Sequence, residues 1–342
     1  MRLKKNSKEL SHCRSNLGSV LVITIWMVTI LVLFVIGLSS LVSNRLGNIK
    51  YFRDTNRAML LALSGINKMR AEMAKEAKSS WYDSLNETWS NNPEQFQEIK
   101  IGSGSVSISY EYESPEGPRT FYGCADEERR ININKAGRPV LTNLFKKVAG
   151  LPEEATKRLV SAIIDWRDTN TTAEPDGAED EYYRTLTPAY PCKNRDFEFT
   201  EELMLIREMT ADIFAKIKDY ITVYGGGRVN INTASITTLS ALGLDEPLIA
   251  KIYNFRSGQD GELGSKDDNI ITTSGELMTK LSNFTSLSPA EIEALNNLII
   301  QDLISVDSKY YRIRALGTIN NRTREVICVV QRGGLIVYWR EM

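Results

Sequence analysis

The sequence predicts an α+β protein in which a long N-terminal helix packs on an antiparallel sheet and a large α-helical domain is inserted into that sheet. Residues 19–42 form an uncharged apolar run, and a helical pattern continues beyond it. Strand-like alternation occurs near residue 110 and again after residue 310, and the long stretch between reads mostly helical. Because the termini of an inserted domain tend to lie close together, one interrupted sheet is the simplest account.

The composition argues against several classes of function. The 342 residues are 42% hydrophobic and 25% charged, with a net charge of −1, so no basic excess indicates a nucleic-acid partner. His12 is the only histidine, and no Gly-x-Ser-x-Gly, His-Glu-x-x-His or phosphate-loop motif occurs. We therefore expect no enzyme activity.

Residues 19–42 are long enough to cross a membrane. As a helix they span about 36 Å, more than the hydrocarbon core of roughly 30 Å. The run is longer than the apolar part of a cleaved secretory signal, although an ordinary signal anchor would look the same. The preceding leader is basic: Arg2, Lys4, Lys5, Lys8 and Arg14 stand against Glu9. The positive-inside rule predicts a single-pass bacterial inner-membrane protein with a cytoplasmic N-terminus and a periplasmic bulk.

Gly18 lies between this leader and the apolar run. A short basic leader that ends in glycine before an apolar helix resembles the precursors of the type IV pilin class. The resemblance implies that a prepilin peptidase removes residues 1–18 by cutting between Gly18 and Ser19, and that the new amine of Ser19 is methylated. Most members begin with Phe at this position, so Ser19 departs from the family.

Ile23 is the fifth residue after the predicted cut, where most pilins carry a glutamate inside the membrane. A lone carboxylate in lipid is costly and needs a partner, which in the family is thought to be the amine of an adjacent subunit. A subunit with Ile23 cannot make that bond to a neighbour above it, which suits the tip of a filament. The K-type minor pseudopilins of type II secretion also lack this glutamate, and in this respect the chain is similar to them.

The helix is expected to continue from residue 43 to about residue 80. This stretch contains no proline and only Gly47 and Gly65, and apolar residues recur at helical spacing from Ile49 to Met73. Such an apolar face needs a sheet to cover it. A coiled coil is the alternative, against which Gly65 and the irregular heptads count.

Short strand-like segments frame the inserted domain. They are residues 104–112, 120–123, 310–319, 324–333 and 334–341. We assign residues 43–135 and 300–342 to a split, pilin-like α+β domain, and residues 136–299 to the inserted domain.

The inserted region carries a repeat. Residues 130–136 (RININKA) and 228–234 (RVNINTA) resemble each other, and two short helical segments follow each. Such openings look like helix–hairpin–helix units, which often bind DNA phosphates through a hairpin with two glycines. Each hairpin here keeps one glycine beside acidic residues, which would repel phosphate. We predict that both units pack against protein and bind no nucleic acid.

Residues 199–227 closely resemble the corresponding stretch of the K-type pseudopilins, and with Ile23 and the repeat the resemblance covers nearly the whole chain. The chain is identified as a member of the K family of the general secretion pathway. The resemblance implies a tip subunit that assembles with minor pseudopilins of the I and J types, within the wider type II secretion machinery, for export across the outer membrane. A minor pilin of a type IV pilus and a membrane-anchored DNA receptor are the alternatives.

An acidic stretch follows the first repeat. Its carboxylates are Asp165, Asp168, Asp176, Glu179 and Asp180. Clustered carboxylates repel one another unless a cation lies among them, and oxygen ligands without histidine or paired cysteines suit Ca²⁺. A solvated loop is the alternative, but the K family is known to hold calcium in this region, so the resemblance favours a calcium site. A second loop, with Asp260, Glu262, Asp267 and Asp268, is either another calcium site or a plain surface loop.

Three cysteines remain once Cys13 is removed with the leader, and an oxidising periplasm permits one bridge. Cys124 and Cys192 have loop-like contexts and are expected to form a disulfide. Cys328 lies inside a predicted strand and is expected to be a buried apolar residue. A pairing with Cys328 stays open.

Overall fold

The computed structural model describes residues 17–76 and 81–342, and the chain divides into two compact units, residues 1–56 and 57–342. Helix α1 (Leu17–Glu76) begins in the first unit. The side chains of residues 19–53 are exposed. Among the described residues, α1 is the one helix long and apolar enough to cross a membrane. The predicted leader lies outside the described residues except for its last two.

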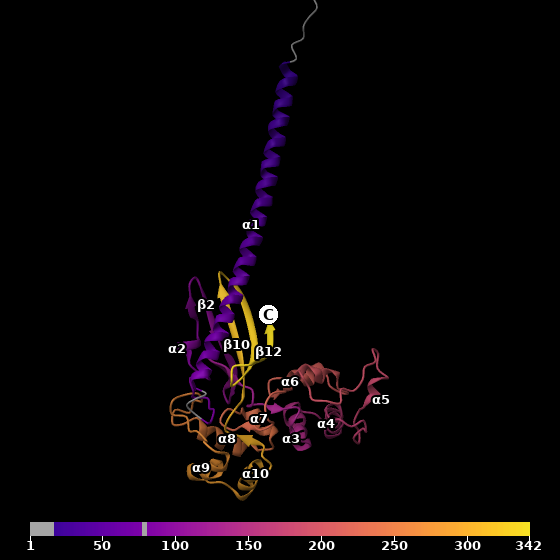
Figure 1. The fold of residues 1–342 in the computed structure, drawn as a ribbon, viewed down its shortest axis with the longest axis vertical. Coiled ribbons are helices and arrows are strands. Elements are labelled where there is room, and N and C mark those ends of the chain that lie inside the picture. The colour runs from indigo at the N-terminus through magenta and orange to yellow at the C-terminus, as the bar shows by residue number, and fades with distance from the viewer. Residues whose placement is uncertain (1–16, 77–80) are drawn as a thin grey trace, which may run out of the picture. The chain divides into compact units, whose positions relative to one another are not determined.

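In the second unit, the C-terminal part of α1 packs on an antiparallel sheet, which confirms the predicted fold class (Figure 1). The helical spacing places Ala58, Ala62 and Ile66 on one buried face. The helix approaches the sheet closely at Gly317, where a Cβ atom would lie 2.0 Å from the main-chain oxygen of Ala58. Glycine is therefore required there by the contact between two backbones.

The main sheet joins both β regions, as predicted. Within the described residues its strand order is β1 (Ile99–Ile101), β2 (Gly104–Ile108), β10 (Tyr310–Ile319), β11 (Arg322–Gln331) and β12 (Ile336–Glu341), with β5 (Ala125–Asp126) also paired to β10. All these pairs are antiparallel. Strands β2 and β10 flank the inserted domain in sequence, and Ser107 lies opposite Leu316. The short helix α2 (Pro93–Phe96) precedes β1.

The single strand expected over residues 104–112 is divided between two sheets. After β2, Ser109 donates its main-chain N–H to the oxygen of Arg314. The next strand, β3 (Tyr110–Ser114), leaves the main sheet and pairs with β4 (Gly117–Phe121) as a separate hairpin. A continuous alternation cannot reveal this change of partner, since both sheets have the same period.

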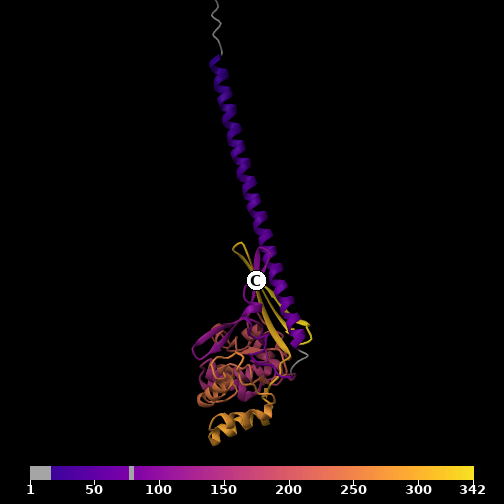
Figure 2. The same ribbon diagram turned by 90° about the vertical axis from the view of Figure 1, so that its left-hand side faces the viewer.

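A second hydrophobic core, whose residues run from Ile131 to Ile304, belongs to the inserted helical domain. Figure 2 shows the backbone of this domain in a second view. Its elements up to β7 are β6 (Ile131–Asn132), α3 (Arg138–Asn143), the π-helix η1 (Leu144–Val148), α4 (Glu153–Arg167), α5 (Asp180–Tyr183), the 3₁₀ helix η2 (Thr200–Leu205), α6 (Ala211–Ile217) and β7 (Ile221–Thr222). The remainder comprises β8 (Val229–Asn230), α7 (Ile236–Ala241), α8 (Glu246–Arg256), the 3₁₀ helix η3 (Ser274–Glu276), α9 (Leu277–Phe284), α10 (Pro289–Ile300) and β9 (Ile304–Ser305).

The two sequence repeats share one structural plan. Strand β6 pairs in parallel with β7, and β8 pairs in parallel with β9. The side chain of the second asparagine in each repeat makes two hydrogen bonds to the main chain of a distant residue. Asn134 donates to the oxygen of Phe197 and accepts from its N–H. Asn232 makes the same two bonds with Ile271. The asparagines of the repeats therefore have a structural role.

In both repeats, an arginine at the end of the last helix forms a hydrogen bond to the main chain near the beginning of the repeat. Arg167, at the end of α4, donates to the main-chain oxygen of Ala136 at 2.6 Å. Arg256, at the end of α8, donates to the oxygen of Ala234 at 2.6 Å. Ala136 and Ala234 occupy the same position in the two sequence repeats, so the duplication extends from the opening strand to the end of the second helix.

Candidate functional site

The first acidic loop follows α4 and holds most of its carboxylates apart. Asp165 is fully buried and accepts main-chain N–H groups from residues 174 and 178, at 2.9 and 2.6 Å. Asp176 pairs with Lys157, and Asp180 pairs with Arg184, each at 2.8 Å. Among the described residues, no group of three Asp, Glu, His or Cys side chains converges closely enough to hold a metal ion. The structure thus does not bring the five predicted ligands into one preformed cage.

Glu179 differs from the other carboxylates of this loop. The residue is 5% exposed, and neither side-chain oxygen accepts a hydrogen bond of regular geometry in the described part of the chain, although the Cys192 thiol and the Asp180 N–H lie near the carboxylate. Burial raises the pKa of Glu179, the Cys192 thiol and the Asp180 N–H lower it in part, and the negative charges of Asp168 and Asp180 raise it. A buried carboxylate with so few donors is costly, and a bound cation would neutralise it. Glu179 could therefore supply one carboxylate ligand to a calcium ion.

The carboxylates of the second loop all have protein partners. Asp267 accepts N–H groups from residues 259 and 260, Asp268 from residues 264 and 265, and Asp260 from residue 262. Glu262 pairs with Arg119 at 3.0 Å. These contacts hold the turn through groups of the chain itself.

The predicted disulfide between Cys124 and Cys192 is wrong, because both side chains are thiols. The Cys124 Sγ lies 3.9 Å from the Sδ of Met73, in the core between α1 and the sheet. The Cys192 Sγ lies 3.7 Å from the main-chain oxygen of Asp165, in the core of the inserted domain. Cys328 is buried in the sheet core, as expected, and burial raises its pKa to about 12.

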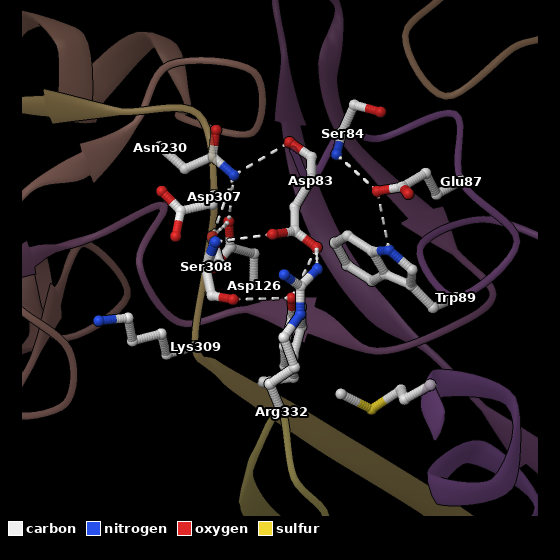
Figure 3. Close-up of polar contacts among 12 residues, drawn as sticks. Asp83, Ser84, Glu87, Trp89, Asp126, Asn230, Asp307, Ser308, Lys309 and Arg332 are labelled. Atoms are coloured by element: carbon white, nitrogen blue, oxygen red, sulfur yellow. Dashed lines mark hydrogen bonds and ion pairs between the residues drawn. The ribbon is translucent and has the colours of Figure 1, made fainter. Parts of the chain in front are cut away.

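A buried polar network joins the sheet to the inserted domain (Figure 3). Asp83 is 1% exposed and accepts hydrogen bonds from the Tyr311 hydroxyl and the Ser308 N–H, each at 2.7 Å. The Arg332 guanidinium lies 2.5 Å from the same carboxylate. Burial and the nearby charge of Asp126 nevertheless raise the pKa of Asp83 to about 7.

Asp126 is the second carboxylate of this network. It accepts hydrogen bonds from the Asn230 amide at 3.1 Å, the Thr233 hydroxyl at 2.5 Å and the Ser308 hydroxyl at 2.7 Å. The Asn230 amide also donates to the main-chain oxygen of Asp83 at 3.0 Å. The network thereby connects three segments of the chain: strand β5, the second repeat and the loop that precedes β10.

The sequence pattern indicates only part of this network. Asn230 belongs to the Asn-Ile-Asn repeat, which marks it as a special residue. Asp83 is an isolated acid, Asp126 is the first of three consecutive acidic residues, and nothing in their spacing links them. Gly18, Ser19 and Ile23 lie together at the start of α1, with Ile23 exposed.

Several known proteins are similar to this chain. The family model described as "Type II secretion system (T2SS), protein K" matches residues 124–226. Type II secretion system protein K of Pseudomonas aeruginosa is 25% identical over 254 residues, which are 73% of this chain and 67% of that protein. The protein of the same name from Aeromonas hydrophila is 25% identical over 178 residues, 52% of this chain and 50% of that protein.

A solved structure supports the fold. The GspK-GspI-GspJ complex of the enterotoxigenic Escherichia coli type 2 secretion system contains a chain that matches with a TM-score of 0.65 at 14% identity. The match covers 86% of this chain and 99% of that one. In sequence and in fold, the chain is thus similar to type II secretion system protein K, and among the described residues it carries one helix that is long and apolar enough to anchor it in a membrane.

Proposed function

We propose that the chain stands at the tip of the type II pseudopilus, where it assembles with minor pseudopilins of the I and J types to initiate and cap the filament. The observation that carries this proposal is the anchor, which has Ile23 and no charged residue over residues 19–42. Such an anchor offers no buried carboxylate to the amine of a subunit above it. The inserted domain adds bulk to a pilin-like sheet and would obstruct further addition.

The chain works by association and not by catalysis, as part of the machinery that exports folded proteins across the outer membrane. It is anchored in the inner membrane with a cytoplasmic leader, which prepilin peptidase removes between Gly18 and Ser19 before Ser19 is methylated. The basic leader and the uncharged run after it support this orientation.

A secretion assay tests the proposal in the bacterium that encodes the chain. Deleting the gene should leave the folded substrates of type II secretion in the periplasm, and restoring the wild-type gene should return them to the medium. A gene with Ile23→Asp, which places a charge in the anchor, should restore less secretion than a gene with Ile23→Leu. Normal secretion in the deletion strain would contradict the proposal.

Calcium in the first acidic loop is a separate part of the proposal, supported by Glu179. The Glu179 carboxylate would be one ligand, with Asp168 the neighbouring acid of the loop. Ligand binding to the folded state stabilises it by about 2.7 kcal/mol at a concentration a hundredfold above Kd. Calcium should therefore raise the melting temperature of the full chain in detergent, and a chelator should lower it again.

Two variants sharpen this measurement. Glu179→Gln should abolish the calcium-dependent rise and should stabilise the calcium-free protein, because it removes a buried charge with few donors. The exposed neighbour Glu181 provides the matched control, and Glu181→Gln should respond to calcium as the wild type does. An unchanged melting temperature in the wild type, or an equal rise in Glu179→Gln, would remove calcium from the account.

A further inference from the structure

Two neighbouring hollows lie where the inserted domain meets the β3–β4 hairpin. The first has a volume of about 740 Å³ and is lined by apolar side chains that include Val148, Ile236 and Ile249. The second has a volume of about 780 Å³, and its lining combines aromatic and apolar side chains with charged residues of both signs. Pro115 and Tyr220 line both hollows, so the two adjoin.

Arg129 is a nearly buried cation in the wall of the second hollow. The residue is 9% exposed, and its guanidinium lies over the rings of Tyr110 and Tyr112, 5.0 and 5.6 Å from their centroids. Its hydrogen bonding in the described part of the chain is limited to the main-chain oxygen of Glu111, at 3.3 Å. A guanidinium has five N–H donors, so most of the hydrogen-bonding capacity of Arg129 is unused.

The other cations of this wall are not fully compensated either. Arg130 and Arg312 share the single carboxylate of Glu127. Lys218, also in the wall, is exposed and has no ion pair among the described residues. This part of the surface is therefore complementary to a negative charge, whereas the whole chain carries a net charge of −1.

Two of the three acidic residues of the wall, Glu111 and Glu113, are held by other groups, and the third is Asp219. The Thr120 hydroxyl donates to Glu111 at 2.9 Å. Thr237 donates to Glu113 through its hydroxyl at 2.7 Å and through its N–H at 3.2 Å. Arg129 thus lies beside glutamates whose oxygens have other partners, and its free donors can reach a ligand.

We propose that the two hollows form a docking site for an extended polypeptide segment that places a carboxylate on Arg129 and an apolar side chain against Ile236 and Ile249. A carboxylate matches the planar fork of a guanidinium and forms strong, charge-assisted hydrogen bonds. Burial in the adjoining apolar hollow supplies the non-polar part of the affinity. A nucleic acid fits less well, since its row of phosphates would pass Glu111, Glu113 and Glu246.

Peptide binding to the full chain in detergent tests this site. The probe is a fluorescent, acetylated octapeptide of alternating leucine and glutamate, and its partner has glutamine in place of every glutamate. The glutamate peptide should bind at least tenfold more tightly, which is the scale of one charge-assisted pair. Arg129→Met should remove this preference, and Lys218→Gln, on an exposed residue, should weaken binding a few-fold without altering the fold.

Arg195→Met is the matched control, because Arg195 lies outside both hollows with a side chain that is 70% exposed. It should bind both peptides as the wild type does. Equal binding of the two peptides, unchanged binding by Arg129→Met and Lys218→Gln, or displacement of the peptide by a short single-stranded DNA at lower concentration would each overturn the proposal. No other pseudopilin is needed for this measurement, so its outcome is independent of the proposed place at the tip.

Discussion

Replacing Gly317 with alanine should strongly destabilise the second unit. Gly317 lies on β10 where α1 crosses the sheet. A Cβ atom there would lie 2.0 Å from the oxygen of Ala58 and 2.7 Å from the nitrogen of Ala62. Both neighbours are main-chain atoms of a helix, so neither can turn aside as a side chain would.

The expected magnitude follows from these distances. A carbon and a carbonyl oxygen that touch are normally about 3.3 Å apart, so the helix must move by roughly 1 Å. Overpacking of a core costs about 1–3 kcal/mol. A gap of about 0.5–1 Å also weakens the dispersion attraction between the helix and the sheet by a quarter to a half wherever it opens. We therefore expect Gly317→Ala to cost about 3 kcal/mol or more.

Gly65→Ala is the matched control on the helix side of the same interface. Its Cβ would meet a methyl group of the Val106 side chain at 2.7 Å, which can move. Alanine also gains about 0.5–1 kcal/mol over glycine inside a helix, which offsets part of the clash. Denaturant unfolding of the full chain in detergent, followed by circular dichroism, measures both variants. If Gly317→Ala were as stable as the wild type, or less damaging than Gly65→Ala, the packing of α1 on the sheet would be refuted.

Three further predictions concern the network, its protonation and the leader. Asn230→Ala should lower the free energy of unfolding by about 3 kcal/mol, because it leaves several buried groups without a partner. Asn132→Ala should lower it by less, because the hydrogen bonds of Asn132 are partly exposed. Denaturant titrations measure both values. The pKa of Asp83 is raised from 3.8 to about 7 in the folded state, so its contribution to stability is complete below pH 4 and is lost as the pH rises to 7. The melting temperature should therefore fall as the pH rises over this window. The fall should be smaller in Asp83→Asn, which has no carboxyl group to titrate. Gly18→Leu should leave the precursor uncut, and normal shortening on a gel would show that the peptidase does not act there.

The regular elements could be predicted because their signals are local. The absence of proline and the helical spacing indicate α1, and ten alternating residues indicate β10. The division at Ser109 could not be predicted, because the same alternation serves β2 in one sheet and β3 in another. Whether a strand changes partner is decided by distant residues such as Arg314, which accepts the N–H of Ser109.

The candidate site was harder to predict for the same reason. Asp176 looks like one of five clustered acids, but it pairs with Lys157 on α4. Cys124 and Cys192 have loop-like sequence contexts, yet each is buried in a different core. The buried carboxylate of Glu179 and the nearly buried guanidinium of Arg129 depend on which side chains surround them, and spacing along the chain does not carry that information.

The place of the chain at the filament tip is tested most directly by purifying the full chain from detergent after coexpression with I-type and J-type pseudopilins of the same bacterium. The mass of the purified particle should correspond to one stable complex that contains all three proteins and survives dilution. If the I-type and J-type proteins bind each other while this chain elutes alone, it is not their tip partner.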